Sequence, residues 1–306
     1  MPDTFFTASP HWGWYIVAYF FVGGIAGGCF FIASLLQLFG RPEDRPVIRL
    51  AHYAACAGAM VSGALLTLDL TKPFRFWHML IASNTGEPIF KAWSPMSVGA
   101  WGLLLFGGAA TLAAAAGLVE EGRLTWRPLR ALTRAGPGRL LAVTGGALGF
   151  FLAGYTGVLL AVTNRPLWAD SPLLGALFLC SAASTGAATL VLLAGRLGRA
   201  HSDTVEWLSR FDRGAMLLEL VVLVAFVASL GAVARVLVGW WGLVLAVGVV
   251  GLGIITPLVL HARGPYGPRR LARAATLVLA GGLLLRVVVI FSSNQIHVTG
   301  SGIALP

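Results

Sequence analysis

Residues 69–101 read DLTKPFRFWHMLIASNTGEPIFKAWSPMSVGAW and connect two strongly apolar runs, 46–68 and 92–118. Each run has the roughly 20 residues that an α-helix needs to cross a bilayer. Pro73 and Pro95 mark neighbouring helix boundaries, because proline suits the first turn of a helix but not its interior. The stretch therefore predicts a surface loop between two membrane-spanning helices.

Ionisable side chains make this loop a candidate functional region. Asp69 follows directly on the first apolar run, and Arg75 and His78 come next among several aromatic side chains. Placing charged groups at the edge of a membrane is costly, so such groups are commonly retained for a function.

The composition is that of an integral membrane protein. Mean hydropathy is +0.82, 57% of the residues are hydrophobic and only 11% are charged, which lies outside the range of soluble globular proteins. We expect an all-α, polytopic transmembrane bundle that forms a single domain over residues 1–306. Cys29, Cys56 and Cys180 lack CxxC spacing and are expected as small buried hydrophobic residues, so no metal site is predicted in this chain.

Apolar windows of about 20 residues recur along the whole chain and predict eight spans. The expected spans are 14–39, 46–68, 92–118, 139–163, 172–194, 214–234, 240–260 and 272–292.

The basic residues alternate between the connections. Sixteen of the 22 Lys and Arg residues lie in or beside the connections after odd-numbered spans, and five lie in those after even-numbered spans. The positive-inside rule then places both termini and the loop at 69–91 on the extracytoplasmic face. The net charge of +10 is thus a topology signal, and no nucleic-acid partner is expected.

Two tyrosines are further candidates for a binding site. Tyr19 lies about one turn inside the first span, where its hydroxyl would point into the bundle. Tyr155 stands between Gly154 and Gly157 in the fourth span, and a phenol there can hydrogen-bond the carbonyl group of a ligand.

Small residues predict where helices pack closely. The first span contains two overlapping GxxxG pairs, Gly23 with Gly27 and Gly24 with Gly28. The fifth span contains SAASTGAATL at 181–190. Both patterns allow the backbone of a neighbouring helix to approach.

Beyond the terminal turns of the predicted spans lie one histidine and two charged residues, namely His52, Glu219 and Arg286. No second histidine lies at the depth of His52, so a b-type haem is not expected. Glu219, with Arg213 one or two turns before it, fits either a structural ion pair or a proton relay from the cytoplasm. Arg286 requires an acid or several carbonyl groups, and Asp69 is the expected partner at that level.

The same blocks together resemble the NrfD/PsrC family, the membrane anchors of polysulfide-reductase-type and related respiratory complexes. The resemblance rests on HWGWYIVAYFFVGGIAGG (11–28), DLTKPFRFWHML (69–80), SPMSVGAW (94–101), YTGVLLAVTNRPLWADSPLLGALFLCSAASTGAA (155–188) and LLRVVVI (284–290).

The resemblance implies a subunit that binds a quinone or quinol, either menaquinone or ubiquinone, near the outer face without a redox metal or haem. An iron–sulfur partner subunit would dock on the outer loops, and a molybdopterin catalytic subunit would complete the complex. The quinone-associated positions of the family fall on Tyr19, where some members have histidine, and on Tyr155. Asp69, Arg75 and His78 match the DLxxPxRFWH block. The implied location is the bacterial inner membrane, with membrane lipid around the bundle.

Quinone chemistry requires the residue types that these blocks contain, because it moves two electrons and two protons. Tyr155 and His78 can hold the carbonyl oxygens, while Asp69 or His78 can exchange protons with water. Arg75 is expected to hold Asp69 or the partner subunit in place. The sequence thus predicts a quinone-binding anchor of a respiratory oxidoreductase complex.

Two other functions stay open at this point. One is a purely structural anchor. The other is an ion or solute transporter with an intramembrane path formed by Glu219, His52 and Arg286.

Overall fold

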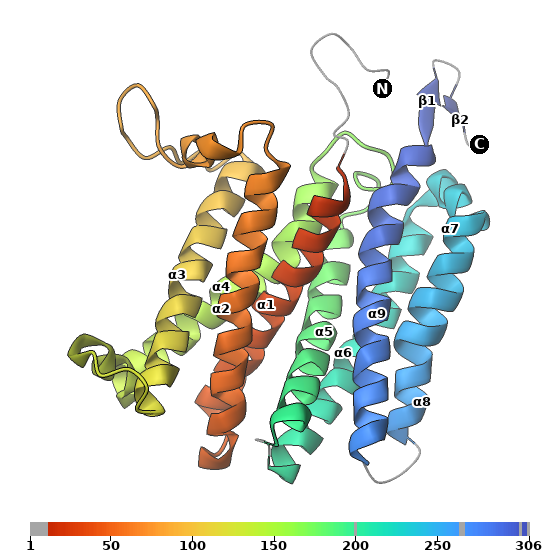
Figure 1. The fold of residues 1–306 in the computed structure, drawn as a ribbon. Helices are drawn as coiled ribbons and strands as arrows, with labels where there is room; N and C mark the ends of the chain where they lie inside the picture. The colour runs from red at the N-terminus through yellow and green to blue at the C-terminus, as the bar shows by residue number, and fades with distance from the viewer. Residues whose placement is uncertain (1–11, 199–200, 263–266, 300–301, 305–306) are drawn as a thin grey trace.

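The computed structural model describes residues 12–198, 201–262, 267–299 and 302–304, which are almost entirely helical (Figure 1). The long helices are α1 (Trp14–Phe39), α2 (Arg45–Asp69), α3 (Pro95–Glu120), α4 (Ala135–Ala161), α5 (Leu174–Leu197), α6 (Ser202–Ser229) and α9 (Pro268–Ser292). Between α6 and α9 lie η4 (Gly231–Val238), α7 (Trp240–Leu243), the π-helical segment η5 (Val244–Ile255) and α8 (Thr256–Ala262). The short elements are η1 (Pro42–Asp44), η2 (Pro73–Met79), η3 (Arg127–Thr133), η6 (Ser293–Gln295) and the antiparallel pair β1 (His297–Thr299) and β2 (Gly302–Ala304).

The all-α, multi-span class is confirmed. Seven helices among the described residues are long and apolar enough to cross a membrane, and α6 together with η4 forms a bent pair that brings the number to eight. The start of α1, the end of α9 and the loop at 70–94 lie at the same end of the bundle, as an even number of crossings requires (Figure 1). Which side of the membrane this end faces stays a prediction.

The sixth span differs from the expected range of 214–234. Helix α6 begins twelve residues earlier, at Ser202, and ends at Ser229. The chain then bends by 110° into η4, at Gly231, whose φ of +54° lies in the left-handed region that glycine adopts without strain. The long amphipathic start of α6 contains charged residues, which is why hydropathy alone placed the boundary too late.

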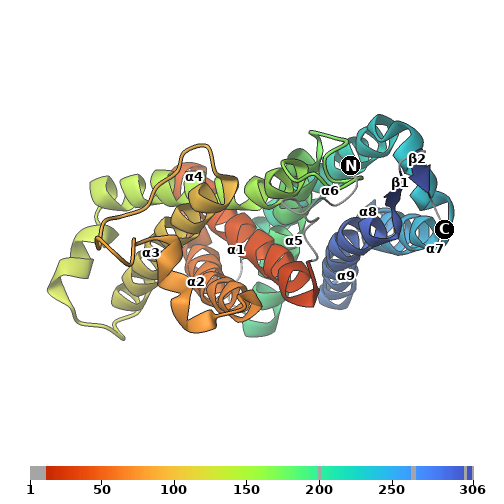
Figure 2. The ribbon, with the colours of Figure 1, turned by 90° about the horizontal axis from the view of Figure 1, so that it is seen from above.

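Helix α1 lies at the centre of the bundle. It packs against α2, α4 and α5, and α5 in turn packs against α6 and α9. Seen from above, α2, α3 and α4 gather on one side of α1, and α6, α7, α8 and α9 lie beyond α5 on the other side (Figure 2). The helices α1 and α5 therefore join two groups of helices.

The glycines of α1 produce the predicted close contacts. A Cβ atom added to Gly149 on α4 would lie 2.8 Å from the carbonyl oxygen of Gly27. A Cβ atom added to Gly28 would overlap the carbonyl oxygen of Ala182 on α5, and Gly186 lies against the same turn of α1. Helix backbones touch at these positions, so only glycine fits.

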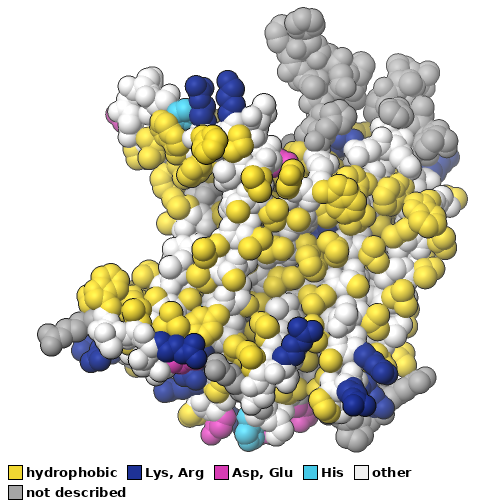
Figure 3. Space-filling view, in the orientation of Figure 1, with side chains coloured by type: hydrophobic (Ala, Val, Ile, Leu, Met, Phe, Trp, Pro, Cys, Tyr) yellow, Lys and Arg dark blue, Asp and Glu magenta, His cyan; other side chains and the backbone are white. Residues whose placement is uncertain are grey.

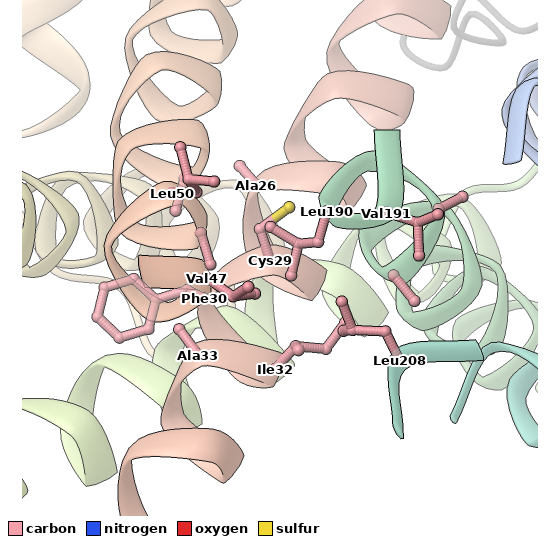
Figure 4. Close-up of a cluster of buried hydrophobic side chains, with 14 of the residues drawn as sticks. Ala26, Cys29, Phe30, Ile32, Ala33, Val47, Leu50, Leu190, Val191 and Leu208 are labelled. Carbon is pink, nitrogen blue, oxygen red and sulfur yellow. The ribbon is translucent and has the colours of Figure 1, made fainter. Parts of the chain in front are cut away.

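Apolar side chains fill the space between the helices. One cluster lies around Cys29, Phe30 and Ile32 of α1, together with residues of α2, α5 and α6 (Figure 4). A second cluster surrounds Phe20 and Phe178 nearer the opposite end of α1. Cys29 and Cys180 are buried and Cys56 is partly exposed, so the first two fit the predicted role of small buried hydrophobic residues.

The outer surface shows the distribution expected in a bilayer. Apolar side chains cover the middle of the visible face, and most Lys and Arg side chains gather toward its two ends (Figure 3). A belt of this kind matches a hydrocarbon core of roughly 30 Å between two headgroup layers.

Candidate functional site

The two predicted tyrosines meet inside the end of the bundle that carries the loop at 70–94. Tyr19 of α1 is only 2% exposed, and Tyr155 of α4 is also buried. Their phenol groups are near enough to interact electrostatically. The structure thus brings together two residues that are 136 positions apart in the sequence.

The Tyr155 hydroxyl has a fixed orientation. It donates a hydrogen bond of 2.6 Å to the carbonyl oxygen of Pro95, at the start of α3. Its ring is stacked on Phe151 at 5.2 Å between centroids and occupies the space where a side chain at position 99 would project, so Gly99 is required there. Because its hydrogen is already donated, the Tyr155 oxygen offers a lone pair and acts as an acceptor toward a further group.

The Tyr19 hydroxyl is differently placed, since it makes no hydrogen bond with any other described residue. Ser62 of α2 is completely buried and its Oγ also lacks a hydrogen-bond partner within the described chain. Both groups lie beside Gly23, whose added Cβ atom would be 3.4 Å from Ser62 Oγ and 3.5 Å from the Tyr19 ring. Buried polar groups without partners are uncommon, and they suggest that something else binds there.

Asp69, Arg75 and His78 lie on the surface segment above the tyrosines. Asp69 is the last residue of α2 and is exposed, and Arg75 is exposed in η2. His78 is half-buried against the adjacent Trp77, with 3.8 Å between ring centroids. None of the three side chains forms a hydrogen bond or ion pair with another described residue. Their participation in one site with the tyrosines stays a prediction.

The prediction that Asp69 pairs with Arg286 is wrong. Arg286 is 1% exposed and donates from Nη1 to Ser181 Oγ at 2.6 Å and to the carbonyl oxygen of Gly282 at 2.8 Å. Its guanidinium group also lies over the Phe178 ring, 5.1 Å from the centroid. Asp69 is exposed at the end of α2, whereas the Arg286 side chain contacts α5. The two residues therefore do not pair.

The acid near Arg286 is Glu219 of α6. Its buried carboxylate lies near enough to Ser181 and Arg286 to interact electrostatically with both. Ser181 accepts the hydrogen bond from Arg286 and so lies between α9 and the acid on α6. Arg213, the cation that the sequence suggested for Glu219, instead lies near His261.

A second buried acid, Asp212, was missed. It is 2% exposed and accepts a hydrogen bond of 2.9 Å from Ser184. Two signals could have identified it, because Asp212 lies seven residues before Glu219 on the same helix face and Ser184 lies three residues after Ser181. Ser184 thus satisfies a buried carboxylate, in addition to the close packing that the SAASTGAATL pattern predicted.

The three residues of the proposed transport path do not form one cluster. His52 packs on Phe30, with 4.9 Å between ring centroids, and its Nε2 atom has no hydrogen-bond partner among the described residues. It belongs to the apolar cluster around α1 and α2, apart from Glu219 and Arg286 on α6 and α9. No group of three or more His, Cys, Asp or Glu side chains in the described part of the protein is arranged to hold a metal ion.

Comparison with known proteins agrees with this architecture. A family model described as "Polysulphide reductase, NrfD" matches residues 3–298, nearly the whole chain. The chain belongs to the NrfD family. It is a multi-span helical membrane protein of that family.

Individual NrfD relatives align over almost their full length. The chain is 28% identical to Protein NrfD of Escherichia coli (strain K12), with 91% of this chain and 92% of the relative covered. It is 28% identical to the C chain of polysulfide reductase from Wolinella succinogenes, covering 92% and 94%. It is 25% identical to the Protein NrfD homolog of Haemophilus influenzae, covering 96% and 97%.

Proposed function

We propose that this NrfD-family chain is the quinone- or quinol-binding membrane anchor of a respiratory oxidoreductase complex in the bacterial inner membrane. The description of the family, polysulphide reductase, and the name of one relative, the C chain of polysulfide reductase, support the role of a subunit in a reductase complex. Electrons pass between the membrane quinone pool and an iron–sulfur subunit on the outer face, beyond which a molybdopterin subunit carries the catalytic centre.

The observation that carries this proposal is the buried pair of phenols. A quinone carbonyl accepts hydrogen bonds, and Tyr19 has a hydroxyl hydrogen available to donate. A quinol hydroxyl donates, and the Tyr155 oxygen can accept because its own hydrogen bonds Pro95. One phenol therefore suits each redox state of the headgroup, and the unpartnered Ser62 hydroxyl provides a third polar contact.

Proton transfer falls to the residues at the membrane surface. A bound quinol supplies two electrons and two protons. Asp69 and His78 lie where water can reach them, at the end of α2 and in η2. A carboxylate and an imidazole can each accept a proton near neutral pH when suitably placed.

The loop at 70–94 is the surface on which we place the iron–sulfur partner. Phe74 is 94% exposed and Trp93 is 82% exposed, and Lys72, Arg75 and Lys91 lie among these aromatic groups. Aromatic and arginine side chains are enriched at the centres of protein interfaces. The same loop carries His78, so a partner docked there would lie beside the proposed proton-transfer residues.

The phenol assignment is tested with Tyr19→Phe and Tyr155→Phe in the purified complex. Each change removes one hydroxyl and keeps the ring, so we expect KM for quinol to rise about three- to tenfold, the effect of one hydrogen bond. Tyr15→Phe is the matched control, because Tyr15 is exposed on the same helix and should be silent. Unchanged kinetics in both buried variants would remove the site from this position.

The proton-transfer assignment is tested separately with Asp69→Asn and His78→Ala. We expect quinol-coupled turnover to be abolished while the complex stays assembled, since a positioned acid or base contributes on the order of 10²–10⁴-fold. Glu87→Gln, an exposed acid in the same loop, is the control. Normal quinol oxidation by both variants would show that protons leave by another route.

A further inference from the structure

A large cavity opens at the end of the bundle opposite the tyrosine pair. It has a volume of about 950 Å³ and lies where α5 ends and α9 begins, between those helices, α6 and α8. Its wall is apolar and includes Val191, Leu192, Leu271 and Leu277. The cavity therefore has an apolar wall that continues toward the middle of the membrane.

The rim of this cavity is basic. Arg196 at the end of α5 and Arg269 and Arg273 in the first turns of α9 line it and are exposed. A second hollow of about 560 Å³ shares Arg269 and Arg273. Two adjoining hollows thus present the same guanidinium groups.

These three arginines carry uncompensated charge. None forms an ion pair or hydrogen bond through its side chain with another residue that the structure describes. The acid in the cavity wall, Glu206, is already paired with Arg210 at 3.2 Å. The cavity therefore retains a positive potential above an apolar wall.

Two other arginines at this end of the bundle form ion pairs with acids near the cavity end. Arg41 contacts Asp203 at 3.2 Å, and Arg123 contacts Glu121 at 3.2 Å. Asp203 and Glu121 are therefore already paired with other arginines. The three cavity arginines remain available to bind a ligand from outside the protein.

We propose that this cavity binds an anionic phospholipid, with its phosphate groups on Arg269, Arg273 and Arg196 and its acyl tails along the apolar wall. The site lies at headgroup level, because the arginines stand in the terminal turns of two spanning helices. Basic pockets between transmembrane helices on the cytoplasmic side suit such headgroups, and charge alternation predicts that this end faces the cytoplasm. Cardiolipin, with two phosphates for three guanidinium groups, fits better than a lipid with one.

The test compares two double variants of the full-length protein, purified with its accompanying subunits and stripped of lipid. Arg269→Gln with Arg273→Gln removes two charges from the cavity. Arg123→Gln with Arg130→Gln removes the same charge from exposed positions at the same end. Binding of cardiolipin, phosphatidylglycerol and phosphatidylcholine is measured by native mass spectrometry and by the shift in Tm.

We expect the wild type and the exposed-site variant to bind cardiolipin at least tenfold more tightly than phosphatidylcholine. The cavity variant should lose this preference, since each basic residue near a membrane surface contributes about a fivefold factor in affinity. Thr276→Phe keeps all charges but fills the exposed groove wall, so it should weaken cardiolipin binding in a folded, monodisperse protein.

Three outcomes would overturn the proposal. The cavity variant could bind cardiolipin as tightly as the wild type. The exposed-site variant could lose as much affinity as the cavity variant, which would show a general charge effect. Inorganic phosphate alone could give the same Tm shift, which would show an anion site without a role for acyl tails.

Discussion

At the scale of single residues, the buried contact between Arg286, Ser181 and Glu219 sets the strongest constraint on this bundle. The Ser181 hydroxyl on α5 accepts a hydrogen bond from Arg286 of α9 and lies beside the carboxylate of Glu219 on α6. Both charged groups are buried, and they interact electrostatically. Removing one partner leaves the other charge buried and unpaired, which is far more costly than removing both.

This asymmetry predicts the outcome of a double-mutant cycle. Arg286→Met should lower the free energy of unfolding in detergent by about 3–5 kcal/mol. Adding Glu219→Gln to that variant should recover part of the loss, because neither charge then remains. Arg235→Met, an exposed position in η4, is the control. Additive losses in the double variant would contradict the coupling.

The same acid gives a second readout from the Glu219→Gln variant alone. Glutamine keeps the size of the side chain and a polar end without the charge, so we expect quinol-linked electron transfer to stay largely intact. Loss of turnover in a stably assembled complex would instead place this acid in the mechanism, as the proton-relay interpretation requires.

The sequence predicted which polar side chains are buried, but it did not predict which residues they contact. The sequence indicated that Arg286 is buried and needs an acid or several carbonyl groups, that the Tyr19 hydroxyl points into the bundle, and that Tyr155 is a phenol on an otherwise bare helix surface. It did not identify Glu219 as the acid, nor Pro95 as the acceptor of the Tyr155 hydroxyl. Depth along a helix can be read from sequence, whereas the rotation of a helix toward a neighbour depends on packing with all the others.

At the scale of elements, α1 is organised by its glycines. Gly27 contacts α4 and Gly28 contacts α5, so two faces of one helical turn, about 100° apart around the axis, carry backbone contacts. The GxxxG pattern predicted close approach correctly, but it could not show which helices approach. Likewise the sixth span was recognised, while its break at Gly231 and its early start at Ser202 were not.

Helix contact at Gly28 predicts a sharp difference between two alanine substitutions. Gly28→Ala would push a methyl group into the carbonyl oxygen of Ala182, and we expect about 1–3 kcal/mol of destabilisation from overpacking. Gly107→Ala on α3 meets open space and should be neutral or stabilise by up to about 1 kcal/mol through helix propensity. Thermal unfolding in one detergent compares them, and equal stabilities would contradict the contact.

At the scale of the whole molecule, the ends of the bundle differ in chemistry. One end carries the tyrosine pair, the loop at 70–94 and the proposed partner surface. The opposite end carries the arginine-rimmed cavity and most of the ion pairs. The placement of quinone chemistry and partner docking on the extracytoplasmic side depends on the predicted orientation.

Orientation is tested by cysteine labelling in right-side-out membrane vesicles. In a Cys56→Ser background, Glu87→Cys should react with a membrane-impermeant maleimide, and Arg130→Cys should react only after permeabilisation. Cys29 and Cys180 are buried and should stay unlabelled. The reverse pattern would invert the molecule and place the proposed partner in the cytoplasm.

The central position of α1 has a consequence for biogenesis. Helix α1 is synthesised before α2, α4 and α5, which later pack against it, and its contact with α5 joins Cys29 to Gly186, 157 residues apart. During synthesis, the glycine-lined face of α1 therefore lacks its α5 partner until the fifth helix has entered the membrane. A nascent polypeptide arrested before α5 emerges would hold that face open to other membrane proteins and to quality-control proteases.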